Sequence, residues 1–129
     1  MKPLNTPTQR SWQDALRYIR ELAARREITD SEWVEIITWL LESEFDGTSF
    51  LAGEAASLLI RDRASARVTD EIDRMTEIAE GWPLYWRLII LPEDHRNRLQ
   101  TIEKCCASPI LLIQQRGMIA MRCQPVVTS

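Results

Sequence analysis

The side chains best suited to chemistry are few, and their spacing does not favour catalysis. His95 is the only histidine, and it directly follows the acidic pair Glu93 and Asp94. An imidazole beside a carboxylate could act as a general acid–base pair. Adjacent residues of a helix point in different directions, however, so this pair lacks the geometry that proton transfer needs. We therefore expect His95 to be a surface residue at the start of a helix.

The three cysteines are Cys105, Cys106 and Cys123. A zinc site normally has four ligands in paired spacing, which three cysteines and one distant histidine do not supply. An odd number of cysteines, two of them adjacent, is not a disulfide framework either. We expect small buried apolar residues, with Cys123 the most exposed.

An acidic run, Asp70, Glu71 and Asp73, could hold a divalent metal or supply the carboxylates of a glycosidase. A polar helix face explains it better, because an apolar stripe at helical spacing passes through the same segment. The chain also has no dinucleotide-binding, P-loop, nucleophile-elbow or zinc-protease motif. The sequence therefore predicts no catalytic residue, no bound metal, no cofactor and no enzyme activity.

The most informative feature is a segment of one charge sign. Residues 27–54 contain eight acidic side chains and no lysine or arginine. The negative charges of such a segment repel one another, and their electrostatic field attracts basic partners. The whole chain has a net charge of −3 and a pI of about 5.2, and it lacks a basic patch interleaved with aromatic residues. We therefore expect a basic protein partner and no nucleic acid.

A partner-binding site is predicted on the expected helix 29–45. On a helical wheel of about 100° per residue, its apolar residues fill one arc and three glutamates fill the opposite arc, with a tryptophan among them. Tryptophan is enriched at binding hot spots. The alternative is that this tryptophan packs against another helix or the N-terminal arm and that the acids are only a solvated face. The basic first helix could also neutralise the acids within the fold. The predicted site consists of Glu32, Glu35, Trp39, Glu42 and Asp46.

The predicted site residues are positioned by helices, and local sequence patterns indicate where those helices lie. The chain has 129 residues, of which 45% are apolar and only four are glycine, a composition that favours one helical domain. Thr29 and Glu32 have the spacing of a capping box, and Pro83 lies where a helix begins. In the third helix, Leu51 and Leu58 are expected to face inward. Helices are predicted at residues 11–26, 29–45, 48–63, 66–80, 83–91, 93–105 and 109–122.

The predicted fold class is all-α, with about seven helices. Helix 83–91 is apolar on nearly every face, so its neighbours must bury it. Two arrangements remain open, an irregular bundle or a short stack of helical pairs. Residues 49–56 and 108–112 resemble second helices of HEAT-type repeats, but the spacing is irregular and matches no repeat signature in full, so neither arrangement is preferred. The expected parts are a flexible arm at 1–10, one helical domain at 11–124 and a tail at 125–129.

The expected location is the cytoplasm. Residues 1–10 are polar and contain proline, unlike a signal peptide. The longest apolar stretch, residues 82–92, is interrupted by Arg87 and is too short to span a bilayer. We therefore expect no contact with a membrane.

A small, acidic, helical chain without catalytic motifs resembles the immunity proteins of bacterial toxin–immunity pairs, some of which are HEAT-like. The resemblance lies in the character of the whole chain. It implies a non-enzymatic, antitoxin-type protein that neutralises a basic partner, a cognate toxin such as a nuclease. The acidic surface of helix 29–45 would bind that partner.

Two other functions remain open from the sequence. In the first, the chain is a homo-oligomeric scaffold or adaptor, and helices 83–91 and 109–122 form the interface of a homodimer. In the second, it is a small-ligand-binding or enzymatic domain with an apolar pocket beside Trp82, Tyr85 and Trp86.

Overall fold

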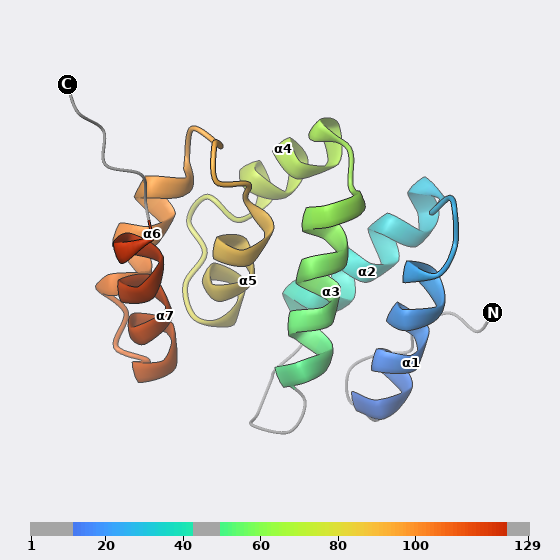
Figure 1. Cartoon of the computed structure of the whole chain (residues 1–129), viewed down its shortest axis with the longest axis horizontal. Coiled ribbons are helices and arrows are strands. Elements are labelled where there is room, and N and C mark those ends of the chain that lie inside the picture. Colours follow the sequence, from blue (N-terminus) through green and yellow to red (C-terminus); the bar gives the residue numbers. More distant parts are fainter. Residues whose placement is uncertain (1–11, 43–49, 124–129) are drawn as a thin grey trace.

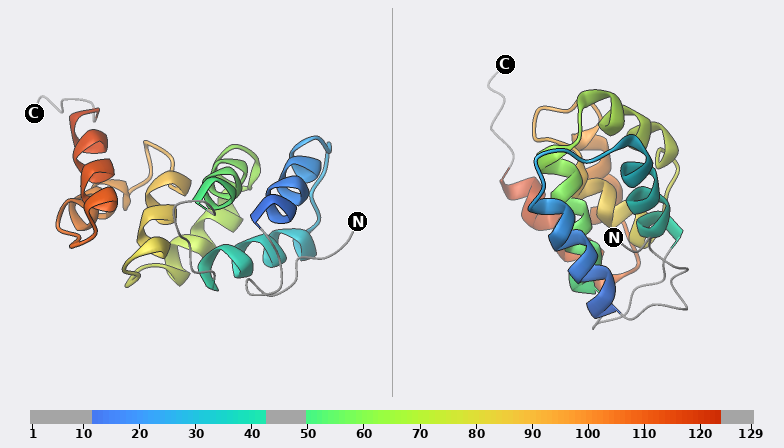
Figure 2. Two further views of the ribbon diagram at one scale, coloured as in Figure 1. Left: turned by 90° about the horizontal axis from the view of Figure 1, so that it is seen from below. Right: turned by 90° about the vertical axis from the view of Figure 1, so that its right-hand side faces the viewer.

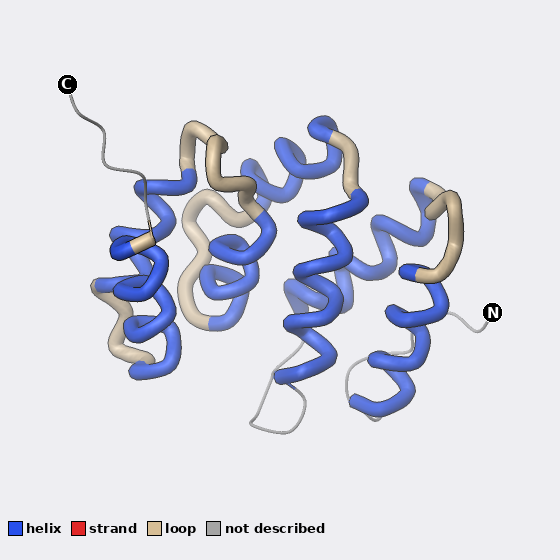
Figure 3. The backbone as a smooth tube through the Cα atoms, viewed as in Figure 1, coloured by secondary structure: helices blue, strands red, loops and turns tan. Residues whose placement is uncertain are grey.

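The computed structural model describes residues 12–42 and 50–123, which form seven α-helices joined by short loops and contain no strand (Figures 1 and 3). The prediction of an all-α fold is therefore confirmed. Each predicted helix has its counterpart in the structure. The helices are α1 Trp12–Ala23, α2 Asp30–Glu42, α3 Phe50–Arg63, α4 Ala66–Met75, α5 Trp82–Ile90, α6 Arg98–Cys106 and α7 Leu111–Arg122.

The helices form two layers in most of the molecule. In Figure 2, α1, α3 and α5 lie side by side in one row, and α2 and α4 run along one side of that row. Helices α6 and α7 pack on each other beyond α5, so α1 and α7 lie at opposite ends of the molecule (Figure 1). Helix α5 contacts α2, α3, α4, α6 and α7, which makes it the centre of the fold.

Helix α5 is buried along its length, as its sequence predicts. Every residue from Leu84 to Leu91 is buried. The rings of Tyr85 and Trp86 pack against Phe50 of α3, with centroid distances of 5.3 and 5.5 Å. Trp82 stacks on Trp86 at 6.0 Å. The aromatic residues considered above for a ligand pocket thus pack against one another as part of the protein interior.

Helix α3 turns a face of small residues toward its neighbours. Ala52, Ala56 and Ser57 are buried, whereas Leu51 and Leu58 are exposed, so the prediction that these leucines face inward is wrong. Helix α3 lies between α1 and α5 and contacts both. Ala52 and Ala56 allow a close approach of the neighbouring helices, and Leu59 and Ile60 are the large residues that α3 buries against them.

Helices α4 and α6 depart most from their predicted bounds, and α1, predicted at 11–26, ends three residues early at Ala23. Helix α4 ends at Met75, five residues early, and the Lys104 ammonium donates to the carbonyls of Glu77 and Ala79 in the chain beyond it. Helix α6 begins at Arg98 because the preceding residues form turns. There the His95 ring accepts a hydrogen bond from the backbone N–H of Asn97 at 3.1 Å.

Arginines of one helix also satisfy the terminal carbonyls of another. Arg98 of α6 donates to the carbonyls of Leu88 and Leu91 at the end of α5, at 2.9 and 2.8 Å. Arg63 of α3 donates to the carbonyl of Ala23 at the end of α1, at 3.1 Å. Helix ends leave carbonyls without intrahelical partners, and cations there also oppose the negative end of the helix dipole. These contacts hold neighbouring helices together.

A buried ion pair joins α4, α5 and α6. Arg87, in the middle of α5, lies 2.5 Å from the carboxylate of Asp73 in α4. Its guanidinium also donates to the Asp73 carbonyl at 2.6 Å and to the hydroxyls of Thr76 and Thr101 at 3.0 and 2.9 Å. Asn97 donates to the second oxygen of the Asp73 carboxylate at 2.8 Å. Arg87 and Asp73 are both buried, so each depends on the other for compensation.

Substitution of one member of this pair should be severely destabilising. We expect Arg87→Met to lower the free energy of unfolding by about 3–5 kcal/mol, because Asp73 is then left as a buried charge without its main partner. The double variant Arg87→Met/Asp73→Leu should lose less than the sum of the two single variants. Urea denaturation measures all three, with the exposed Arg61→Met as control. Additive losses would contradict a direct coupling between the two residues.

Candidate functional site

Glu32, the first residue of the predicted acidic surface, serves the structure of its own helix. The Thr29 N–H donates to the Glu32 carboxylate at 3.0 Å, and the Glu32 N–H donates to the Thr29 hydroxyl at 3.2 Å. The predicted capping box is thus confirmed. This backbone hydrogen bond is the main reason why the pKa of Glu32 lies below its usual range, and the neighbouring Arg25, which forms an ion pair with it, acts in the same direction.

Glu35 faces α1. It is half-buried and accepts a hydrogen bond of 3.0 Å from the Tyr18 hydroxyl. Burial, together with this acceptor, raises the pKa of Tyr18 above its ordinary value, so Tyr18 remains a neutral donor. The arc of α2 that carries Glu32 and Glu35 thus lies beside α1 and the residues after it. Arg25, which follows α1, forms an ion pair with Glu32. For this acid, neutralisation by the first helical segment is therefore observed.

The prediction that Trp39 lies on the surface among the carboxylates is wrong. Its side chain is only 7% exposed and belongs to the hydrophobic core, which is the alternative stated above. On α2 it shares the arc that contains Glu32 and Glu35, and a large indole on that covered arc is removed from water. Glu42 is exposed, and Asp46 lies outside the described residues. Of the five predicted site residues, only Glu42 is thus shown at the open surface.

His95 is not the surface residue that the sequence indicates. Its side chain is 8% exposed, and its Nε2 lies 3.5 Å from the Asp70 carboxylate. Asp70 and Glu71 are exposed, as expected of a polar helix face, whereas Asp73 is buried against Arg87. Within residues 12–42 and 50–123, no group of three or more histidine, cysteine or acidic side chains is placed to hold a metal ion.

The cysteines are unpaired and differ in exposure. Cys105 is buried, Cys106 is half-buried and Cys123 is exposed, as predicted for this last residue. Burial raises the pKa of the Cys105 thiol to about 12. The thiolate is the reactive form, so Cys105 is protected both by its position and by its protonation.

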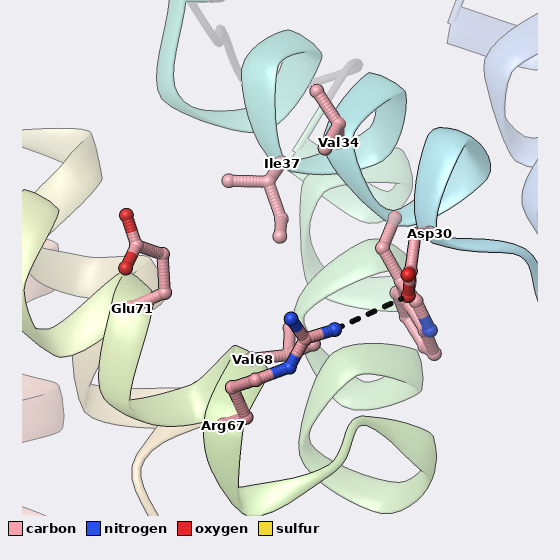
Figure 4. Close-up of a pocket in the computed structure, with 7 residues that line it drawn as sticks. Asp30, Val34, Ile37, Arg67, Val68 and Glu71 are labelled. Atoms are coloured by element: carbon pink, nitrogen blue, oxygen red, sulfur yellow. Dashed lines mark ion pairs between the residues drawn. The ribbon is translucent and has the colours of Figure 1, made fainter.

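An open groove lies on the other side of α2, between that helix and α4. It has a volume of about 330 Å³, and its apolar lining consists of Trp33, Val34 and Ile37 from α2 and Val68 from α4. Val34 is 63% exposed, although it belongs to the apolar arc of its helix. Figure 4 shows Val34 and Ile37 on α2, facing the α4 side chains across the groove. Surfaces of this kind accept apolar side chains of a partner segment.

Charged side chains line the edges of the groove. Arg67 reaches across from α4 to Asp30 at the start of α2, at 3.5 Å (Figure 4). Glu71 lies on the same face of α4 and forms an ion pair with Arg74. The Arg67 and Asp30 side chains are largely exposed, so their ion pair is weak and can open for a partner at small cost.

The groove was not predicted from the sequence. Val34 and Ile37 belong to the apolar arc of α2, a pattern that indicates core residues. No periodicity in one helix shows where a neighbouring helix leaves part of that arc uncovered. The one signal at sequence level is the location of α2 within the acidic segment 27–54.

A second groove, of about 740 Å³, lies at the other end of the molecule. It is formed largely by the loops before α5 and between α6 and α7. Lys104, its cationic side chain, already donates to the carbonyls of Glu77 and Ala79. Four large apolar residues line the α2–α4 groove, against Leu84 and Ile110 here, and Val34 is the most exposed of them, which favours the α2–α4 groove as the binding site.

Comparison of the chain with protein-family models, with curated proteins and with solved structures finds no significant match. None of the described helices has both the length and the apolar character that crossing a bilayer requires. The functional proposal below therefore rests on the geometry of the groove and on the charge of the chain.

Replacement of Trp39 by alanine should destabilise the folded protein. We expect Trp39→Ala to lower the free energy of unfolding by about 3–5 kcal/mol, as removal of a buried aromatic side chain does. Glu42→Lys, at an exposed position of the same helix, should change it by less than about 0.5 kcal/mol. Urea denaturation of both variants tests this. A Trp39→Ala protein as stable as the unmodified chain would contradict the buried position of the indole.

Proposed function

We propose that this chain is a non-enzymatic protein-binding module whose site is the α2–α4 groove. The observation that carries the proposal is the exposure of Val34 beside Ile37 and Val68 in an open groove. An apolar side chain in water gains free energy when a partner covers it, at roughly 25 cal/mol per Å² buried. The occupant is a segment that offers apolar side chains at its centre.

Charge supports a basic partner. The segment 27–54 contains α2 and has no basic residue, and Asp30 and Glu42 are exposed near the two ends of that helix. Acidic groups at the edge of an interface accelerate the approach of a basic protein, while the apolar centre determines how slowly the complex dissociates. The acids turned toward α1 contribute to the field but not to direct contacts.

The resemblance to immunity proteins makes the neutralisation of a toxin one form of this function. In that case the partner is a single basic protein from the same cell. The exposed apolar face of α7 favours a second form, a homo-oligomeric scaffold, because such faces are usually covered in an assembly. In both forms the protein acts by binding.

The test is capture of partners from source-cell lysate with the C-terminally tagged chain. We expect Val34→Lys to weaken retention of a basic partner by more than about tenfold, because the substitution removes an apolar contact and repels the partner's charge. High salt should also weaken retention. Quantitative mass spectrometry of the retained proteins measures both effects.

Leu51→Lys is the matched control, because it places the same charge at an exposed leucine of α3 outside the groove. It should retain the partner as the unmodified chain does. A partner that is held equally by the Val34→Lys protein would show that the binding surface lies elsewhere.

A further inference from the structure

Helix α7 has an apolar outer face at one end of the molecule. Leu111 is 64% exposed and Ile119 is 54% exposed, and Leu112 and Met118 are also exposed between them. Leu111 and Met118 are seven residues apart, as are Leu112 and Ile119, so each pair repeats after two helical turns. The outer surface of α1, at the other end, carries Gln13, Asp14, Arg17 and Glu21 instead. Among the described residues, the outer face of α1 is thus polar, whereas that of α7 is largely apolar.

Close packing on α6 keeps this face turned outward. A Cβ atom on Gly117 would lie 2.7 Å from the backbone nitrogen of Cys106 and 2.8 Å from the Cβ of Cys105. Only glycine permits this approach of α7 to α6. Ile113, one turn away, is fully buried on the same side. Rotation of α7 to hide its leucines would break this contact, so the apolar face is a fixed surface.

The charge of this region is opposite to that of α2. Residues 104–129 contain three basic side chains and no acidic one, whereas residues 27–54 contain eight acids and no base. Arg116 and Arg122 are both exposed on α7. The helix therefore offers apolar side chains with basic groups beside them. The acids that line the groove are Asp30 and Glu71, whose ion pairs with Arg67 and Arg74 are weak because all four side chains are largely exposed.

We propose that α7 of one copy docks in the α2–α4 groove of a second copy. The inference rests on the proposed function of that groove and names its partner as this chain itself. Leu111, Leu112, Met118 and Ile119 supply the apolar face of a helix laid in a groove, and Arg116 and Arg122 lie toward the acidic α2. The charge complementarity between the two regions selects this contact over a pairing of two basic α7 helices.

The contact is heterologous, because it joins two different surfaces of the molecule. In a dimer of this kind, the copy that contributes α7 keeps an unused groove, and the copy that contributes the groove keeps an unused α7 face. Addition of further copies therefore continues until a ring closes or a filament grows. Self-association should depend on protein concentration and weaken in high salt.

The test uses two single variants of the full chain and their mixture. Val34→Lys damages the groove, and Ile119→Glu damages the α7 face with a charge that the acidic segment repels. Sedimentation velocity should show the unmodified chain associating beyond the 15.0 kDa monomer as its concentration rises. Each variant alone should associate at least about tenfold more weakly.

An equimolar mixture of the two variants should recover a species of twice the monomer mass and no larger one. One copy then contributes an intact groove and the other an intact α7, while the remaining surfaces are both damaged. Leu51→Lys should associate as the unmodified chain does. A mixture that stays monomeric would overturn the inference, and so would self-association by Val34→Lys alone, which would indicate pairing between two α7 helices.

The lysate capture described above separates this inference from the proposed function. An unmodified chain that stays monomeric, yet retains a basic partner through Val34, overturns only the self-association. A Val34→Lys protein that neither loses a partner nor associates less overturns the groove as a binding site, and with it both proposals.

Discussion

The fold depends on a buried arginine held by a carboxylate. Arg87 is the only charged residue of α5, and its contacts with Asp73, Thr76 and Thr101 join that helix to α4 and α6. A charge this deeply buried is tolerated only where its partner and hydrogen bonds are all in place. The requirement fixes the position of α4 on α5. Since α4 forms one side of the α2–α4 groove, the ion pair also determines where that surface lies.

The acidic segment has two roles that its sequence does not separate. Some of its acids stabilise the fold. Glu32 closes the capping box of α2, and Glu35 accepts a hydrogen bond from the Tyr18 hydroxyl of α1. Others, such as Asp30 and Glu42, are at the surface of α2 and give that side of the molecule its field. The acids that matter for recognition are therefore fewer than the composition indicates. Of these two surface acids, Asp30 lines the α2–α4 groove.

Local signals predict the helices well, and tertiary packing explains where prediction fails. The Thr29–Glu32 capping box, Pro83 at the start of α5 and the apolar faces of α1, α2 and α5 can each be recognised within one segment. Which arc of α2 is covered depends on α1 and α4, so a helical wheel of α2 alone shows neither that Trp39 is buried nor that Val34 is exposed. His95 is buried because α4 approaches it, which no neighbouring residue in the sequence indicates.

A partner that binds at the α2–α4 groove leaves the arc of α2 that faces α1 out of the contact. Hydrogen exchange followed by mass spectrometry, on the chain alone and on the complex recovered from lysate, distinguishes these two surfaces. Binding at the groove should slow exchange in α2 and α4 within the complex and leave α1 unchanged. Protection confined to α1 and its link to α2 would instead place the site on the acidic arc.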